Sequence, residues 1–300
     1  MSLRSQARPG QSDPRLALPT MVFLAATIGV PLAITVVYSF LERAKVGMGV
    51  SWEFTPVAYK KLFVIENLDG TTGFDTRYIK VLWNSFFYSA VTTVATVLLS
   101  LPIAMWIATR KESVRNFLVA AVTLPFWISI LIRTYGLRQI IDDNGPIGWV
   151  AQKLGYESFH IIYTPTATMI GLTYVFLPFM ILPIYASAER FDFRLAEAAY
   201  DLGAHRWTVF RRIVLPAIRP GIIAGTALVF IPALGSFLQS NMLGGGKTNM
   251  IANIIELNFT QARNWPFGSA LSVLLILLTL IFVLAIRKVA QRYGDKLRLV

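Results

Sequence analysis

Long apolar runs are the feature that most limits how this chain can fold. A helix needs about 20 residues to cross the ~30 Å hydrocarbon core of a membrane. Runs of about this length follow one another along the chain, at residues 16–40, 81–108, 116–138, 161–186, 221–240 and 266–287. With 55% hydrophobic and 15% charged residues, the chain also has more apolar surface than one soluble core can bury. We therefore expect an all-α integral membrane protein with six transmembrane helices.

The basic residues predict which ends of the spans face the cytoplasm. Of the 28 Lys and Arg residues, 17 lie in segments that would share one side of the membrane, namely 1–15, 109–115, 187–220 and 287–300. Basic residues in short loops mark the cytoplasmic side. We therefore expect both termini in the cytoplasm, with residues 1–15 as a tail and residues 16–300 as one transmembrane domain. The aromatic-rich 41–80 segment on the opposite side predicts a folded extracytoplasmic cap.

The composition argues against several other classes of protein. The formal charge of +12 is spread between hydrophobic segments, so we expect contact with membrane lipid and no nucleic-acid partner. With no cysteine and two histidines, no metal site is expected. The absence of HExxH, GxSxG or paired catalytic carboxylates argues against an enzyme. The absence of an internal repeat or an ionisable relay in the spans argues against a self-sufficient secondary transporter.

The stretch MLGGGKTNM, residues 242–250, is close to a phosphate-binding loop but does not complete the pattern. Such a loop requires a glycine five positions before its Gly-Lys pair, and this position is Asn241. A membrane span, not a β-strand, precedes the stretch. Lys247 would also lie on the extracytoplasmic side, away from cytoplasmic ATP. We therefore expect the three glycines to form a tight, close-packed turn.

Proline and glycine interrupt several predicted spans. Each proline removes a helix hydrogen bond, which favours kinked helices around a pathway, although membrane helices also tolerate single prolines without a functional reason. The interruptions are Pro31, Pro102, Pro125, Pro178, Pro183, Pro232 and Gly235.

The end of the fifth span, FIPALGSFLQSN at residues 230–241, combines such an interruption with polar residues. Pro232 and Gly235 precede the polar residues Ser236, Gln239, Ser240 and Asn241. Transport proteins place substrate contacts at discontinuous helices with polar neighbours. The same residues can also mark a simple exit of the helix from the membrane. Both interpretations remain open at the level of sequence.

Arg133 lies near the end of the third span. A charged side chain inside a membrane is unfavourable unless it is paired or functional. We expect it to extend to the membrane interface toward Asp142 or Asp143, as long basic side chains do near helix ends.

The 187–220 segment is too long for a simple connection between helices. Apolar residues recur at helical spacing up to Leu202 and again from Trp207, which predicts two short helices joined at Gly203. Glycine can end the first helix with a positive φ, and Pro216 would cap the second. Such an element can dock on another protein, or it can lie on anionic lipid as a basic amphipathic helix.

The order of residues in this segment resembles the EAA motif of permease subunits in binding-protein-dependent ABC importers. That motif reads Glu-Ala-Ala, three residues, Gly, nine residues, and then Ile-x-Leu-Pro. Every fixed position is present, as Glu197, Ala198, Ala199, Gly203, Ile213, Leu215 and Pro216. The resemblance implies that the segment forms a coupling helix in a groove of an ATPase subunit, with Asp201 also at the contact. The small Ala198 and Ala199 would let that subunit approach closely.

The resemblance extends over nearly the whole chain. LIRTYG (131–136), DNGPIG (143–148), LPFMILPIYAS (177–187) and FIPALGSF (230–237) are similar to B-type permeases of the spermidine/putrescine branch of this family. The family implies the type I ABC importer permease (MetI-like) fold in a bacterial inner membrane. It also implies a second homologous permease, two ATPase subunits that bind ATP and Mg, and an extracytoplasmic substrate-binding protein. This chain itself would bind no cofactor and hydrolyse no ATP.

Two classes of solute remain open. The resemblance implies a polyamine, and we expect its pathway at Tyr135, Pro232, Gly235, Ser236, Gln239 and Asn241. A polycation favours carboxylates and aromatic faces. The predicted spans contain no Asp or Glu, and Ser236 stands where the family often has an acidic residue. The alternative is therefore a non-polyamine solute, such as an amino-acid derivative or another small organic ion.

Overall fold

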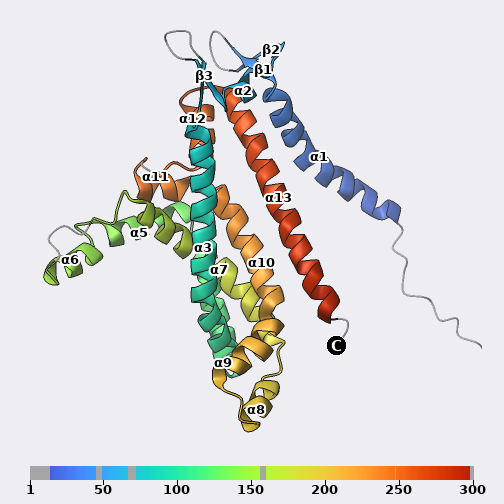
Figure 1. Cartoon of the computed structure of the whole chain (residues 1–300), viewed down its shortest axis with the longest axis vertical. Coiled ribbons are helices and arrows are strands. Elements are labelled where there is room, and N and C mark those ends of the chain that lie inside the picture. The colour runs from blue at the N-terminus through green and yellow to red at the C-terminus, as the bar shows by residue number, and fades with distance from the viewer. Residues whose placement is uncertain (1–13, 45–48, 67–71, 156–159, 247, 298–300) are drawn as a thin grey trace, which may run out of the picture.

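The computed structural model describes residues 14–44, 49–66, 72–155, 160–246 and 248–297. In this part of the chain, five long helices are apolar enough to cross a membrane (Figure 1). They are α1 (Pro14–Tyr38), α3 (Arg77–Ala108), α7 (Pro165–Glu189), α10 (Leu215–Leu234) with the helical turns before it, and α13 (Trp265–Leu297). A sixth span is present if the bent pair of segments Glu112–Trp127 and Ile130–Lys153 is counted as one.

The third predicted span, residues 116–138, is not one continuous helix but a sharply bent pair of helical segments. The helices here are α4 (Glu112–Thr123), the 3₁₀ turn η1 (Leu124–Trp127), α5 (Ile130–Ile141) and α6 (Pro146–Lys153). Ile128 and Ser129 have extended backbone angles, and the segments on either side meet at 97°. Pro125 lies in η1, where it cannot donate the hydrogen bond that would continue α4. α5 and α6 consequently project sideways from the bundle (Figure 1).

The other interruptions leave the helices intact, apart from the end of the fifth span. Pro31, Pro102, Pro178, Pro183 and Pro232 all lie inside helices. Ordinary tolerance of proline therefore accounts for most of them.

Helix α7 forms the centre of the bundle, packed between α3 and α10. Its buried side chains include Leu172, Met180 and Ile184. Helix α3 carries a stripe of buried hydroxyl residues that the sequence analysis did not identify: Ser85, Ser89, Thr92, Thr93, Thr96 and Ser100. Several of these hydroxyls donate to carbonyls one turn earlier in α3, so they do not need a partner on another helix. Small residues of this kind let membrane helices approach closely.

Two glycines of α10 hold it close to α7. A Cβ added at Gly221 would lie 2.3 Å from the Pro183 carbonyl oxygen and 2.6 Å from the Ser187 hydroxyl oxygen. A Cβ added at Gly225 would lie 2.5 Å from the Met180 sulfur. The two helices cannot keep their present spacing if residue 221 carries a side chain.

We expect Gly221→Ala to lower the free energy of unfolding by about 1–3 kcal/mol, because the new methyl group must displace backbone atoms of α7. The matched control is Gly29→Ala in α1, where no atom lies within 4 Å of the added Cβ and alanine favours the helix. Thermal unfolding of the two variants in detergent checks the prediction. Equal melting temperatures would contradict the close packing of α7 and α10.

The segment between α1 and α3 forms a small folded cap, as expected. It consists of antiparallel strands β1 (Leu41–Arg43) and β2 (Val50–Phe54), helix α2 (Val57–Lys60), and antiparallel strands β3 (Val64–Glu66) and β4 (Thr72–Phe74). The Tyr59 and Ser39 hydroxyl oxygens lie 2.8 Å apart and tie α2 to the end of α1. Arg77 donates to Asp75 over 2.7 Å, and this bond lowers the pKa of Asp75. The short strands are the exception to the predicted all-α architecture.

The cap lies at one end of the molecule, and α8 (Arg194–Asp201) and α9 (Arg206–Val209) form the opposite end, with α3 extending between them (Figure 1). From the cap, α1 and α13 both extend toward the half of the molecule that contains α8. This arrangement is compatible with termini on one side of a membrane. Of the predicted tail, residues 1–13 lie outside the described residues, and residues 14 and 15 already belong to α1.

Candidate functional site

The predicted coupling segment forms an exposed turn at the α8 end of the bundle. α8 ends two residues before Gly203, which has φ +81°, and α9 follows. The Gly203 N–H donates to the Tyr200 carbonyl at 2.8 Å, and the Ala204 N–H donates to the Ala199 carbonyl at 3.0 Å. These bonds form the Schellman pattern that ends a helix at a glycine with positive φ. The prediction that two helices meet at Gly203 is confirmed, but the second helix is not short, because it continues from Arg206 to Leu234.

One face of this element is anchored in the protein and the other face is open. Ala196 and Val209 are buried in the core cluster that also contains residues of α3 and α7. Leu202 and Trp207 are apolar, yet they are 89% and 63% exposed. Exposed apolar side chains of this kind suit a partner protein or a lipid surface. The exposed residues of the motif are Glu197, Ala198, Asp201 and Gly203.

Ala199 differs from its predicted role. It is half-buried and packs against the protein's own core cluster. The helical turn that places Ala198 outward directs Ala199 inward, because successive residues of a helix point about 100° apart. Only Ala198 therefore leaves room for the close approach of another subunit.

The Ile-x-Leu-Pro part of the motif lies inside the fold. Ile213, Leu215 and Pro216 are half-buried, and the first two pack against the core cluster. Pro216 was expected to cap the second short helix, but the chain remains helical through it, so this prediction was wrong. A π-helical turn, η2 (Phe210–Val214), precedes the proline, and hydrogen bonds there reach five residues back. This wider turn accommodates a residue that cannot donate, and the helix continues.

The fifth span is a discontinuous helix. α10 ends at Leu234, and a short helix, α11 (Leu238–Gly244), follows the break at Gly235. Gln239 of α11 is fully buried, donates to the Thr134 hydroxyl of α5 over 3.3 Å, and accepts from the Ser236 hydroxyl. The polar residues after Gly235 therefore connect the broken fifth span to the broken third span.

Further polar contacts surround α11. Asn253 of helix α12 (Ile251–Thr260) donates to the Asn241 side chain at 2.6 Å. The Thr248 hydroxyl lies 3.0 Å from the Thr168 hydroxyl of α7, and the Thr248 carbonyl accepts from Ser240. We call these side chains the polar cluster; its members are Thr134, Thr168, Ser236, Gln239, Ser240, Asn241, Thr248 and Asn253.

The polar cluster includes residues that the sequence did not point to, namely Thr134, Thr168, Thr248 and Asn253. Small polar residues are common in membrane helices, so neither their type nor their spacing distinguishes them. One signal was present for Thr134, which lies inside the LIRTYG segment that resembles the permease family.

The triple glycine forms a tight, close-packed turn, as predicted. A Cβ at Gly244 would lie 1.8 Å from the Thr248 hydroxyl oxygen, and a Cβ at Gly245 would lie 2.4 Å from the Tyr163 ring. Tyr163 itself has φ +60°, which is unusual for a bulky residue. Its hydroxyl accepts from Arg138 of α5. Lys247 lies outside the described residues.

The remaining predicted pathway residues are exposed. Pro232, Gly235 and Asn241 lie at the surface of the chain, and Tyr135, next to Thr134, is 51% exposed. Gln239, in contrast, has no exposed surface. The exposed residues are therefore open to the surroundings of the chain, whereas Gln239 lies inside and joins α11 to α5.

Arg133 does not pair with Asp142 or Asp143 in the described chain, so this prediction was wrong. Asp142 follows Arg133 by nine residues, which is about 13 Å along a helix and too far for a direct bond. Asp143 instead lies 2.6 Å from His160. The Nε and Nη1 atoms of Arg133 are buried and have no hydrogen-bond partner among the described residues.

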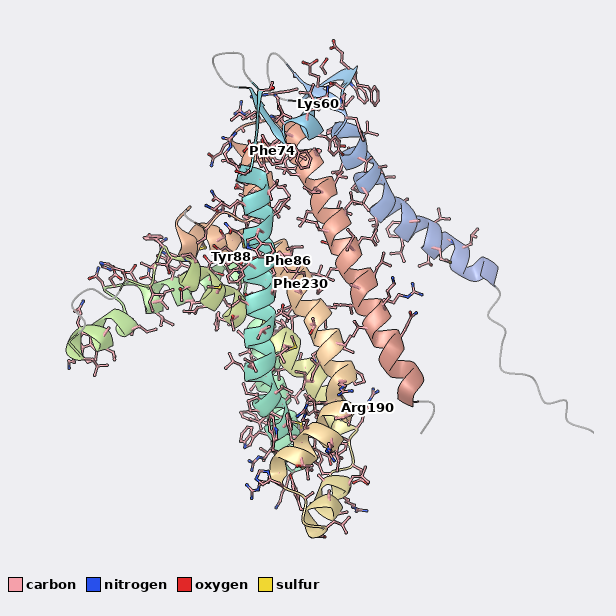
Figure 2. All side chains as sticks on the ribbon, in the orientation of Figure 1. Lys60, Phe74, Phe86, Tyr88, Arg190 and Phe230 are labelled. Atoms are coloured by element: carbon pink, nitrogen blue, oxygen red, sulfur yellow. The ribbon has the colours of Figure 1, made fainter. Side chains whose placement is uncertain are left out.

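An apolar groove of about 590 Å³ lies between α3, α10 and α13. Phe86 of α3 and Phe230 of α10 meet edge to face in it, with ring centroids 5.5 Å apart (Figure 2). None of its described lining residues carries a charge. The groove therefore does not suit a charged solute.

Comparison with known sequences identifies clear relatives. Residues 78–295 match the family of binding-protein-dependent transport system inner membrane components. The chain is 42% identical over 223 residues to the spermidine/putrescine transport system permease protein PotB of Haemophilus influenzae, which covers 73% of this chain and 77% of that protein. It is 37% identical over 242 residues to the PotB protein of Escherichia coli, which covers 80% of this chain and 87% of that protein.

Solved structures support the same fold. A bacterial ABC transporter that imports the acidic polysaccharide alginate matches with a TM-score of 0.69 and 17% identity, covering 93% of this chain and 94% of that chain. The MetNI methionine ABC transporter matches with a TM-score of 0.54 and 17% identity, covering 72% of this chain and 95% of that chain. At this level of identity the likeness concerns the fold alone.

Proposed function

The chain belongs to the family of binding-protein-dependent transport system inner membrane components, and from this premise we propose that it takes up polyamines such as spermidine and putrescine. It is a multi-pass permease of the inner membrane, with the fold of type I ABC importer permeases. The identity of 37–42% to spermidine/putrescine permeases, over most of the chain, supports the solute. The observation that carries the transport mechanism is the exposed turn at Gly203, anchored on one face and open on the other.

The open face of this turn is the contact with a partner ATPase. Leu202 and Trp207 supply apolar area, and Glu197 and Asp201 supply charge. When the ATPase subunits close on ATP, they move α8, and the buried Ala196 transmits this motion to the core. ATP and Mg are bound by the partner, and this chain carries out no chemistry.

The motion reaches the solute pathway through the continuous helix that begins at Arg206. This helix runs from the coupling turn to the break at Gly235 without interruption. Beyond the break, α11 is tied to α5 by Gln239 and Thr134. A shift of α10 therefore moves both broken spans together.

Besides lipid, this chain has three kinds of partner in the assembly. A second homologous permease completes the pathway, two ATPase subunits dock on the coupling turns in the cytoplasm, and an extracytoplasmic binding protein delivers the solute at the cap end. Both termini of this chain lie in the cytoplasm, on the same side as α8. The excess of Lys and Arg in segments 187–220 and 287–300 supports this orientation.

A specific observation favours a second candidate, an importer for a non-polyamine solute. The polar cluster contains hydroxyl and amide groups but no carboxylate. A polycation gains most from carboxylates, so under the polyamine proposal the second permease or the binding protein supplies them.

ATPase activity of the co-expressed complex in lipid tests the proposal. We expect spermidine or putrescine, together with the cognate binding protein, to raise the rate of ATP hydrolysis above the rate with the binding protein alone. Stimulation only by amino-acid derivatives or other organic ions would contradict the polyamine assignment but leave the importer mechanism intact. An ATPase that does not co-purify with this chain would contradict the mechanism itself.

A further inference from the structure

The elbow between α4 and α5 combines an unpaired cation with an exposed apolar surface. The Nε and Nη1 atoms of Arg133 are buried without a partner among the described residues, although the side chain as a whole is only half-buried. A guanidinium in such a position is unfavourable unless an anion reaches it. In the isolated chain, the Arg133 guanidinium therefore lacks acceptors for two of its nitrogen atoms among the described residues.

Large apolar side chains lie exposed around Arg133. Trp127 is 87% exposed, and Leu131, Ile132 and Tyr135 are each more than half exposed. Trp, Tyr and Arg are the residues that contribute most to binding energy when a partner covers them. We call this surface, formed by Trp127, Ile128, Leu131, Ile132, Arg133 and Tyr135, the elbow surface.

The position of the elbow surface limits which partner can cover it. α5 lies beside α11, between the cap and the α8 end, and projects sideways from the bundle (Figure 1). An ATPase docked on α8 and a binding protein docked on the cap would lie at the two ends, away from this level. A protein that reaches this level must therefore be embedded in the membrane.

We infer that the elbow surface binds the second permease subunit, and that this subunit supplies an Asp or Glu carboxylate to Arg133. The inference rests on the proposed function, which requires a second permease. An arginine suits this contact because its planar guanidinium can donate two parallel hydrogen bonds to one carboxylate. The apolar side chains around it exclude water and strengthen the pair.

Arg133→Met tests the inference in the co-expressed complex. The change leaves the partner's carboxylate buried and unpaired, so we expect the amount of second permease retained on purification to fall by about ten-fold or more. Arg133→Lys keeps the positive charge but cannot donate two parallel hydrogen bonds to one carboxylate, so this variant should retain an intermediate amount of the second permease. The matched control is Lys153→Met at the exposed end of α6, which also removes one positive charge and should retain the wild-type amount.

A second measurement separates this role from a purely internal one. The full chain expressed alone should melt at the same temperature or higher after Arg133→Met, because the lost charge has no partner among its described residues. If Arg133→Met lowered the melting temperature of the chain expressed alone, the inference would be overturned. The inference would also be overturned if the Arg133→Met complex retained as much second permease as the wild type does. If that complex at the same time lost bound anionic phospholipid, the partner of Arg133 would be a lipid phosphate.

Photo-crosslinking identifies the neighbour directly. A benzophenone side chain at Ile132 should crosslink to a segment of the second permease that contains an acidic residue, and crosslinks to lipid alone would overturn the inference. Failure of the proposed function has a different signature: the wild-type chain would then retain no second permease at all.

Discussion

Gly203→Val is expected to reduce ATP-driven transport by about ten-fold while leaving the membrane bundle folded. Gly203 has φ +81° and closes the Schellman turn between α8 and α9. A β-branched residue in this conformation is strained by about 1–2 kcal/mol, which corresponds to roughly a ten-fold change in the population of the docking geometry. Transport and ATPase activity of the purified complex check this prediction.

Two controls separate the turn from general strain. Gly203→Asn should retain most of the transport activity, because asparagine adopts positive φ more readily than other side chains. Gly155→Val introduces comparable strain at φ +88° just after α6, which projects sideways from the bundle and lies away from α8 (Figure 1), and no atom lies within 4 Å of the added Cβ. It should leave transport unchanged. Equal losses at Gly155 and Gly203 would show that α8 has no special role in coupling.

Gln239→Leu is expected to abolish most solute-stimulated ATPase activity without releasing the ATPase subunits. Leucine has a similar volume but leaves the Ser236 hydroxyl without its acceptor and Thr134 without its donor. An unsatisfied buried polar group costs about 1–3 kcal/mol, and the direct bond between α5 and α11 is lost. ATPase assays with and without solute, together with co-purification of the ATPase, check both parts of the prediction.

The matched control for this change is Asn249→Leu. Asn249 lies in the same connection after α11, but its side chain is exposed. The variant adds the same apolar side chain without disturbing the polar cluster, so stimulation by the solute should persist. If Gln239→Leu behaves like this control, the polar cluster does not take part in transport.

Local signals in the sequence predicted the coupling turn well. Helical spacing up to Leu202 and the glycine after it determine where α8 ends, because a helix that stops at a glycine requires only nearby backbone bonds. The close packing of the triple glycine also follows from short-range geometry, since a chain with three successive glycines can turn where side chains cannot fit.

The errors arose where distant contacts or unusual turns decide the structure. Hydropathy identified residues 116–138 as apolar but could not show that the chain leaves the helix at Ile128. The π-helical turn before Pro216 depends on hydrogen-bond spacing that no residue pattern specifies. The predicted partner of Arg133 was chosen because it is near in sequence, whereas the direction of α5 carries Asp142 away from it.

Uptake of radiolabelled spermidine into proteoliposomes tests the central claim most directly. The vesicles would contain the complete complex with ATP and Mg on the ATPase side and the binding protein on the other side. We predict that spermidine accumulates only with ATP and the binding protein, that unlabelled putrescine competes, and that Gly203→Val lowers the rate about ten-fold. Spermidine uptake that continues without ATP, or ATP-driven uptake of other solutes but not of spermidine, would contradict the account.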